Sequence, residues 1–340
     1  MVVTNSLSGG GAERSMNMLV NELYDRGLCV CLVPINSGAA DRIIPKCDVF
    51  EIRREWEGGA WNTFLAWVRF VKLVWNWGPT DLVLNCDVTE FFGATSPIHV
   101  RNLIVVEHAN PAWSTRQAFG RIIRRILALR SAKWVAVSSH LTIWPSKGKP
   151  DAVLQNSVEF PANPKVIYQN DSKCKIERLV FVGRLAEQQK RPSWVLEIAH
   201  SLDYPVLFVG EGSMRKELMQ NSEENGSKSE FSGFVTDPWS LILKGDLLLF
   251  PSAWEGDGLV VLEAMVQDIP FLLTDIPDFR RFNLPEENYC SSIENFKTRI
   301  REYSPSLELL RIPNEVRSPI LDARNNKVIG DSWEKYFLEN

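Results

Sequence analysis

Two glutamates that lie eight positions apart, Glu255 and Glu263, stand out in residues 251–265, PSAWEGDGLVVLEAM. An apolar run ending at Phe250 precedes this segment, and a helix is expected to begin near Gly258. The N–H groups of a first helical turn have no partner within the helix, so a diphosphate fits there. Carboxylates would repel that diphosphate, and the two glutamates are instead expected to accept hydrogen bonds from sugar and ribose hydroxyls. This chemistry is typical of a carbohydrate site.

Two cations follow a second apolar run, in the segment FVGRLAEQQKRP. Arg184 comes directly after that run, and Lys190 lies six positions later, at the start of the next expected helix. As a bond from a sugar to a phosphate breaks, negative charge grows on the departing phosphate, and fixed cations stabilise it more than they stabilise the ground state. The pair is therefore suited to a diphosphate leaving group. For Lys190, an ordinary surface lysine is the alternative interpretation.

Apolar runs alternate with helical patterns along the whole chain, which indicates parallel sheets covered by helices. The pattern begins a second time after the polar, proline-containing stretch 155–177. We therefore expect an α/β protein of two doubly wound, Rossmann-like domains. Their expected boundaries are residues 1–160 and 161–327, followed by a terminal helix at 328–340 that crosses back to the first domain.

Composition restricts the class of protein. With 340 residues, 45% hydrophobic and 24% charged, the chain is typical of a globular protein rather than a disordered or fibrous one. Its six cysteines have neither metal-ligand spacing nor the density of a secreted disulfide scaffold, which fits a reducing cytoplasm. Cys29 and Cys31 alternate in an apolar run and are expected to pack in the core from one face of a strand. No signal peptide or membrane span is recognisable.

Residues 251–265 resemble the signature of family 4 of the retaining glycosyltransferases, the glycosyl transferases group 1 type. In that signature, a glutamate, seven residues and a second glutamate are preceded by Pro-Ser and followed by Ala-Met. Further segments extend the resemblance over nearly the whole chain: NSLSGGGAERS, VVEHANP, VAVSSHLT, LQNSVEF, FVGRL, FVGEGSMRKEL, FSGFVTDP and SWEKYF. The resemblance implies the GT-B fold, in which a cleft separates an acceptor-side and a donor-side domain. The chain departs from the family at Ser157, Asp257 and Asp268, and Asp257 stands where relatives usually carry a less charged residue.

The resemblance also implies roles for single residues of the second domain. Glu255 would contact the transferred sugar and Glu263 the nucleotide ribose, while Arg184 and Lys190 would stabilise the leaving diphosphate. The remaining donor contacts that it implies are backbone groups: Gly258 and Leu259 at the diphosphate, and Val235, Gly210 and Gly212 around the base.

The first domain contributes a glycine run and a histidine. The run at residues 8–11 lacks the G-x-G-x-x-G spacing of a dinucleotide turn, which argues against NAD. The resemblance instead brings Gly10 and Gly11 close to the donor phosphates. His108 follows the apolar run 103–107, and in many relatives the residue at this position donates a hydrogen bond to the reacting sugar. A buried structural histidine is the alternative.

Residues 116–130 form a basic amphipathic pattern, with no Asp or Glu between His108 and Pro150. A helix there is expected to place Phe119, Ile122, Ile123, Ile126 and Leu127 on one side and Arg121, Arg124 and Arg125 on the other. One interpretation is a surface that touches an anionic membrane. The other is a core-packed helix with a solvated arginine face.

The function that follows is a cytoplasmic, metal-independent glycosyltransferase of bacterial surface-polysaccharide biosynthesis, such as that of lipopolysaccharide O-antigen. It would move a hexose or N-acetylhexosamine from a nucleoside-diphosphate sugar, with a UDP-sugar favoured, to a glycan acceptor that can be lipid-linked, with retention of configuration. No D-x-D motif and no cluster with metal-ligand spacing occurs, so no cofactor is expected. A nucleic acid is not an expected partner. A UDP-sugar 2-epimerase of the same fold and a non-catalytic sugar-nucleotide-binding protein are the alternatives.

Overall fold

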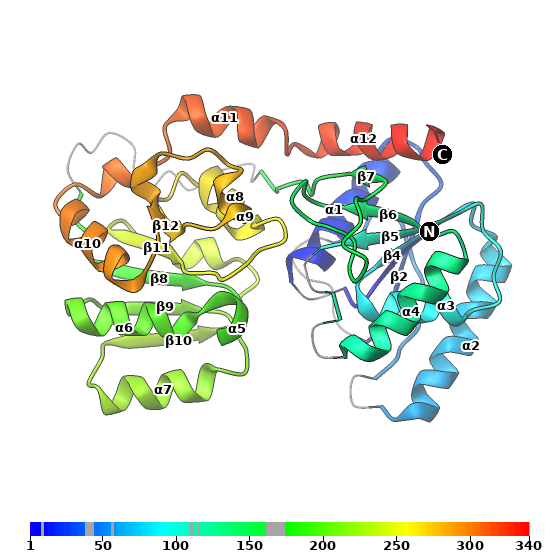
Figure 1. The fold of residues 1–340 in the computed structure, drawn as a ribbon, viewed down its shortest axis with the longest axis horizontal. Coiled ribbons are helices and arrows are strands. Elements are labelled where there is room, and N and C mark those ends of the chain that lie inside the picture. Colours follow the sequence, from blue (N-terminus) through cyan, green and yellow to red (C-terminus); the bar gives the residue numbers. More distant parts are fainter. Residues whose placement is uncertain are drawn as a thin grey trace. The chain divides into compact units, whose positions relative to one another are not determined.

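The computed structural model of the protein describes residues 1–7, 10–37, 44–55, 58–108, 112, 113, 116–160 and 174–339. The chain forms two compact units (Figure 1). The first comprises Met1–Glu159 and Arg324–Asn340, and the second comprises Phe160–Ala323. Each unit contains one parallel sheet with helices packed against it. The predicted fold class, two doubly wound α/β units, is therefore confirmed.

The sheet of the first unit has seven described strands, all parallel, in the order β3-β2-β1-β4-β5-β6-β7. Their bounds are β1 (Val2–Thr4), β2 (Cys31–Pro34), β3 (Asp48–Val49), β4 (Asp81–Asn85), β5 (Asn102–Glu107), β6 (Lys133–Ala136) and β7 (Ala152–Val153). The central strands β1, β4 and β5 are buried on both faces almost throughout, which is why they consist of continuous apolar runs.

Helices cover both faces of this sheet. The described helices are α1 (Gly11–Asp25), α2 (Ala60–Trp77), α3 (Asp87–Thr95), α4 (Gln117–Leu129) and α12 (Asn326–Glu339). One core joins the sheet to α1 and α12, and a second core joins its other face to α2, α3 and α4. The two groups can be followed on opposite sides of the strands in Figure 1.

The prediction that Cys29 and Cys31 share a core-facing position is wrong for Cys29. Strand β2 begins only at Cys31, which is buried, whereas Cys29 precedes the strand and is exposed. Alternation along the sequence places two residues on one face only where both belong to the same strand.

The orientation predicted for α4 is also partly wrong. Ile122, expected on the apolar side, is 55% exposed, whereas Arg124, expected in solvent, is 3% exposed. The Arg124 guanidinium donates hydrogen bonds to the carboxylates of Glu90 in α3 and Glu107 at the end of β5. Since two buried carboxylates need a cation, the helix turns Arg124 inward and leaves Arg121 and Arg125 outside.

The sheet of the second unit has six described parallel strands, in the order β10-β9-β8-β11-β12-β13. Their bounds are β8 (Arg178–Val182), β9 (Val206–Val209), β10 (Ser229–Gly233), β11 (Asp246–Phe250), β12 (Phe271–Thr274) and β13 (Tyr289–Cys290). The chain starts at β8, proceeds outward through β9 and β10, and then returns to the other side of β8 at β11. This reversal creates a topological switch point between β8 and β11.

Helices and short helical turns surround this second sheet. They are α5 (Glu187–Lys190), α6 (Pro192–Leu202), α7 (Arg215–Glu224), η1 (Pro238–Leu241), α8 (Leu259–Val266), α9 (Pro277–Arg280), η2 (Glu286–Asn288), α10 (Ile293–Tyr303), η3 (Leu307–Leu310) and α11 (Asn314–Asp322). A core on one face of the sheet contains residues of α6, α7 and α10. Among the described ranges of the chain, no helix has both the length and the apolar character needed to cross a membrane.

Replacing Trp333 with alanine tests how strongly α12 stabilises the first unit. Trp333 is 1% exposed and belongs to the core between α1 and the sheet. Because the change removes a large buried side chain and leaves a cavity, the free energy of unfolding should fall by about 3–5 kcal/mol. Urea unfolding followed by circular dichroism measures this. Leu338→Ala, at a position that is 77% exposed, is the matched control and should behave as wild type.

Candidate functional site

The carboxyl ends of β8 and β11 mark the place where a doubly wound sheet binds ligands, because the chain direction reverses between these two neighbouring strands. The loop after β8 contains Arg184, and α5, which follows it, ends at Lys190. The loop after β11 contains Glu255 and leads into α8. Both loops therefore start from the same edge of the second sheet.

A short ion pair connects the two loops. Lys190 Nζ lies 2.5 Å from Glu255 Oε1, and the two side chains are only 17% and 9% exposed. Ser252 Oγ donates a second hydrogen bond to the same oxygen, at 2.6 Å. The backbone N–H of Ala253 also donates to the carbonyl oxygen of Gln189, at 2.7 Å. The structure thus brings two of the predicted site residues, Lys190 and Glu255, into direct contact.

Arg184 is exposed at the same edge, and no described side chain forms an ion pair or hydrogen bond with its guanidinium. Its loop is held by a close backbone approach to the loop after β9. A Cβ atom at Gly210 would lie 2.0 Å from the carbonyl oxygen of Gly183, so only glycine fits at Gly210. The Leu185 N–H donates to the carbonyl oxygen of Glu211, at 2.9 Å. Gly210 therefore has a structural role in positioning the Arg184 loop.

Helix α8 begins where the sequence predicted. Gly258 caps it with the left-handed conformation, φ 60°, and Leu259 is its first residue. The first-turn N–H groups point out of the helix N-terminus and attract anions. Glu263, on the next turn of α8, is 6% exposed and accepts a hydrogen bond from Trp239 Nε1 of η1, at 3.2 Å.

Two residues of the α9 region hold the loop that carries Glu255. Asp278 Oδ2 accepts a hydrogen bond from the Glu255 backbone N–H, at 2.7 Å. Arg281 Nη2 donates to the Asp257 carbonyl oxygen at 2.5 Å and to its Oδ1 at 2.7 Å. The side chains of Arg281 and Asp257 are 15% and 2% exposed, so Asp257 is buried together with its cation.

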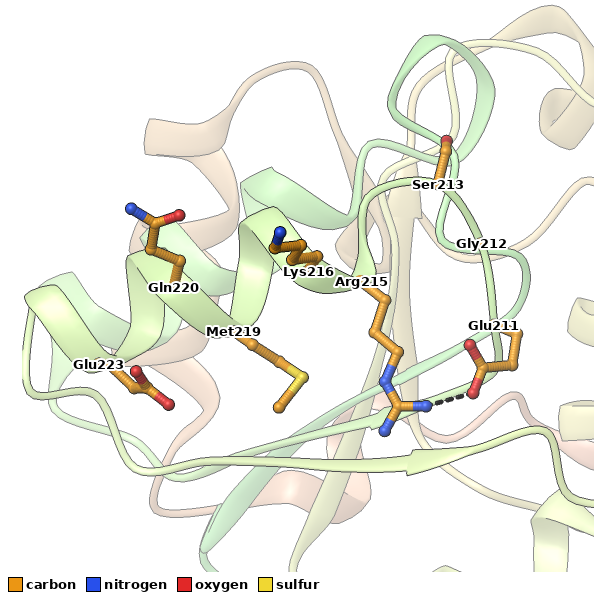
Figure 2. A pocket seen from close by; sticks show the side chains of 8 residues that line it. All are labelled: Glu211, Gly212, Ser213, Arg215, Lys216, Met219, Gln220 and Glu223. Atoms are coloured by element: carbon orange, nitrogen blue, oxygen red, sulfur yellow. Dashed lines mark hydrogen bonds and ion pairs between the residues drawn. The ribbon is translucent and has the colours of Figure 1, made fainter.

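The remaining residues predicted for the second unit lie in neighbouring loops. Val235 is half-buried and follows β10 by two positions. Next to Gly210, the loop before α7 borders a shallow cavity of about 490 Å³. Figure 2 shows the Arg215 guanidinium directed towards the Glu211 carboxylate in this cavity, where the two form an ion pair. The cavity is lined by Glu211, Gly212, Ser213, Arg215, Lys216, Met219, Gln220 and Glu223.

In the first unit, Gly10 and Gly11 lie at the start of α1, and the Gly10 N–H donates a hydrogen bond to the Glu13 carboxylate, at 3.1 Å. His108 directly follows β5 and is half-buried. All three lie at the carboxyl edge of the first sheet. Ser8, Gly9 and residues 109–111, which belong to the motifs quoted above, lie outside the described residues.

A sealed ion-pair cluster lies beside His108. The side chains of Arg124, Glu90 and Glu107 are 2%, 1% and 1% exposed. Glu90 accepts two hydrogen bonds from Arg124 and one from Trp113, and Glu107 accepts one from Arg124 through Oε2. Burial raises the pKa of Glu107 to about 7, because its contact with Arg124 only partly offsets the loss of hydration.

Among the described residues, no three His, Cys, Asp or Glu side chains are grouped as a metal site would require. Arg184, Lys190 and the N-terminus of α8 contribute positive charge near the switch point.

The family model of the "Glycosyl transferases group 1" matches residues 176–300, which contain β8 to α8 and hence both site loops. Over these residues, the second unit resembles the glycosyl transferases group 1.

Curated relatives agree with this assignment. The chain is 29% identical over 175 residues to the GalNAc-alpha-(1->4)-GalNAc-alpha-(1->3)-diNAcBac-PP-undecaprenol alpha-1,4-N-acetyl-D-galactosaminyltransferase of Campylobacter jejuni, covering 49% of this chain and 47% of that protein. It is 27% identical over 142 residues to the UDP-Gal:alpha-D-GlcNAc-diphosphoundecaprenol alpha-1,3-galactosyltransferase of Escherichia coli, covering 37% of this chain and 36% of that protein. The matched segments thus span half or less of these relatives.

Among solved structures, Anabaena Alr3699/HepE in complex with UDP and glucose superposes with a TM-score of 0.79 at 14% identity. The alignment covers 100% of this chain and 99% of that one, so the likeness in fold extends over both units.

Within the second unit, the sequence prediction missed Trp239, Asp278 and Arg281. The extra charge of Asp257 was the one available signal for Arg281, because a buried carboxylate needs a nearby cation. Asp278 and Trp239 act through contacts between residues more than twenty positions apart, which local patterns do not reveal.

Replacing Arg281 with methionine should destabilise the second unit, because it leaves the buried Asp257 carboxylate without its cation. The expected loss in the free energy of unfolding is on the order of 3 kcal/mol. The double variant Asp257→Asn/Arg281→Met removes both charges and should recover most of the loss. Urea unfolding of the two single variants and the double variant measures the coupling. Purely additive effects would contradict a direct role for the ion pair.

The pH dependence of stability tests the Glu107 assignment. Glu107 has a raised pKa of about 7 in the folded protein and an ordinary value of 4.5 when unfolded, so the folded state binds the proton more tightly. Its contribution to stability should therefore increase as the pH falls from 8 towards 5. The difference in free energy of unfolding between wild type and Glu107→Gln should shift in favour of wild type over this range. For Glu51→Gln, at an exposed position, the difference should stay constant.

Proposed function

We propose that the chain is a retaining glycosyltransferase that moves a hexose or N-acetylhexosamine from a UDP-sugar to a glycan acceptor held on a lipid diphosphate. The observation that carries the proposal is the ion pair between Lys190 and Glu255. It lies at the sheet edge that also carries the exposed Arg184 and the N-terminus of α8. A pyrophosphate needs cations and free N–H groups, and a sugar needs hydrogen-bond acceptors. One sheet edge supplies both.

In the proposed complex, the two phosphates lie between Arg184, Lys190 and the first-turn N–H groups at Gly258 and Leu259. Glu255 accepts a hydrogen bond from the transferred sugar and Glu263 accepts one from the ribose. Val235 and Gly210 border the nucleotide. Lys190 is paired with Glu255 in the structure, so a bound diphosphate would share this cation with the carboxylate.

The proposal also includes three residues of the first unit. Gly10 and Gly11 would approach the donor phosphates, and His108 would approach the reacting sugar. The acceptor hydroxyl attacks C1 of the sugar on the same face as the departing phosphate. The bond from C1 to the phosphate oxygen breaks, and the hydroxyl proton passes to that oxygen. The cations neutralise the charge that develops, so the reaction is proposed to need no metal.

The names of two relatives support the proposed acceptor. Two matched bacterial enzymes are named for acceptors on undecaprenol diphosphate, and one of them for a UDP-sugar donor. We infer that this protein likewise acts in surface-polysaccharide assembly, at the cytoplasmic side of an anionic membrane.

Loss of the leaving-group cation tests the proposal. Arg184→Ala should lower acceptor-dependent release of UDP by about 100-fold or more, which is typical when one charge-stabilising group is removed from a transition state. Glu255→Ala should abolish transfer as well. Arg301→Ala, which removes an exposed arginine of α10, is the matched control and should keep wild-type turnover. EDTA should leave the rate unchanged.

The UDP-release assay, analysis of the released sugar and thermal shift together separate the alternatives. Wild-type turnover in Arg184→Ala would contradict the leaving-group role. Release of an epimerised sugar without an acceptor would indicate an epimerase instead. A shift in melting temperature with GDP- or ADP-sugars but not with UDP-sugars would refute the choice of nucleotide, because a ligand that binds the native state raises apparent stability.

A further inference from the structure

The outer face of α2 is covered by exposed aromatic side chains. Trp61, Phe64 and Trp75 are 71%, 49% and 66% exposed, and their spacing places them on one side of the helix. The opposite side packs on the sheet through Ala66, Phe70 and Val74. The rings of Trp61 and Phe64 stack with centroids 5.5 Å apart. Exposed apolar side chains that gather on one face, rather than lying singly, are typical of a surface that contacts a protein or a membrane.

Helix α4 presents a similar mixed face. Ile122 and Leu129 are 55% and 87% exposed, and Arg121 and Arg125 are exposed next to them on the same side of the helix. This face exists because Arg124 is turned inward to its buried carboxylates. The rotation that overturned the sequence prediction thus brings apolar and basic side chains together in solvent.

The two helices belong to one layer. Both α2 and α4 pack on the same face of the first sheet, with α3 between them, as Figure 1 shows. Trp67 of α2 donates a hydrogen bond to Thr95 of α3, and Phe91 of α3 contacts the ring of Phe119 of α4. The outer faces of α2 and α4 therefore form one surface, which we call the α2–α4 face.

The charge of the α2–α4 face has a single sign. Neither helix contains Asp or Glu, and their exposed charged side chains are Arg69, Lys72, Arg121 and Arg125. Basic residues interspersed with tryptophan and aliphatic side chains complement the anionic headgroups and the interfacial region of a bilayer. A helix of 18 residues is about 27 Å long, so several such side chains can insert along one plane.

We propose that the α2–α4 face docks the protein on an anionic phospholipid bilayer. Helices α2 and α4 both begin at the carboxyl edge of the first sheet, because each follows a strand of that parallel sheet. Trp61, Phe64 and Ile122 are thereby near the edge that carries His108. A bilayer on this face would present a lipid-held acceptor beside that edge, a consequence that rests on the function proposed above.

Vesicle sedimentation tests the docking surface. The protein should bind vesicles of phosphatidylcholine mixed with phosphatidylglycerol. It should bind vesicles of phosphatidylcholine alone much more weakly. Trp61→Ala/Phe64→Ala/Trp75→Ala should lower binding to the mixed vesicles by about tenfold or more. Lys72→Gln/Arg125→Gln should lower it about tenfold on mixed vesicles only, because the electrostatic contribution depends on anionic lipid. Leu243→Ala/Leu309→Ala removes two exposed leucines of the second unit and should bind as wild type.

Two results would overturn the proposal. One is that the wild-type protein does not bind the mixed vesicles. The other is that the triple aromatic variant binds them as strongly as the wild-type protein does. Light scattering that shows a dimer, dissociated by the aromatic substitutions, would assign the face to a second copy of the chain instead. Transfer to an acceptor with a short, water-soluble lipid is measured in parallel. The aromatic variants should retain that activity, so a failure of docking and a failure of the proposed transferase function give different results.

Discussion

The Lys190–Glu255 ion pair is the contact on which the candidate site depends. It joins the loops that leave β8 and β11, and its nitrogen and oxygen are 2.5 Å apart. A carboxylate that is 9% exposed would be costly without a cation, so the pair stabilises both segments that it joins. The same cation remains within reach of an anionic ligand at the switch point. One interaction thus stabilises the two segments and holds a cation at the place where the proposed diphosphate would bind.

The surrounding contacts fix the carboxylate more firmly than the cations. Ser252 and the Asp278 contact hold the Glu255 loop, and Arg281 holds the neighbouring Asp257. Arg184, by contrast, is exposed and extends from a loop whose backbone is locked by Gly210. A firmly held carboxylate beside an exposed cation fits the proposed transfer, in which negative charge would develop on a departing phosphate.

Much of the fold could be predicted because central parallel strands are buried on both faces and read as apolar runs. Strand β11 ends at Phe250 and strand β5 ends at Glu107, where the sequence predicted the ends of two apolar runs, for this reason. The errors arose where burial depends on distant partners. Arg124 faces inward because Glu90 and Glu107, 34 and 17 positions away, are buried opposite it. Local sequence patterns do not predict the contacts of Asp278 and Arg281 either, because their partners are distant in the sequence. Gly258 could be predicted because the start of a helix has local sequence signals.

Each unit places a glutamate and a cation at the carboxyl edge of its sheet, yet the two pairs differ in access. In the first unit, Arg124 and Glu107 are 2% and 1% exposed, and the cation is also bound by Glu90. In the second unit, Lys190 and Glu255 are 17% and 9% exposed, with the open Arg184 on the adjacent loop. A sealed pair can hold helices in place but cannot exchange partners with a ligand, whereas a partly open one can do both. Residue type at a strand end therefore does not identify a site by itself, and access to solvent decides which pair can bind a ligand.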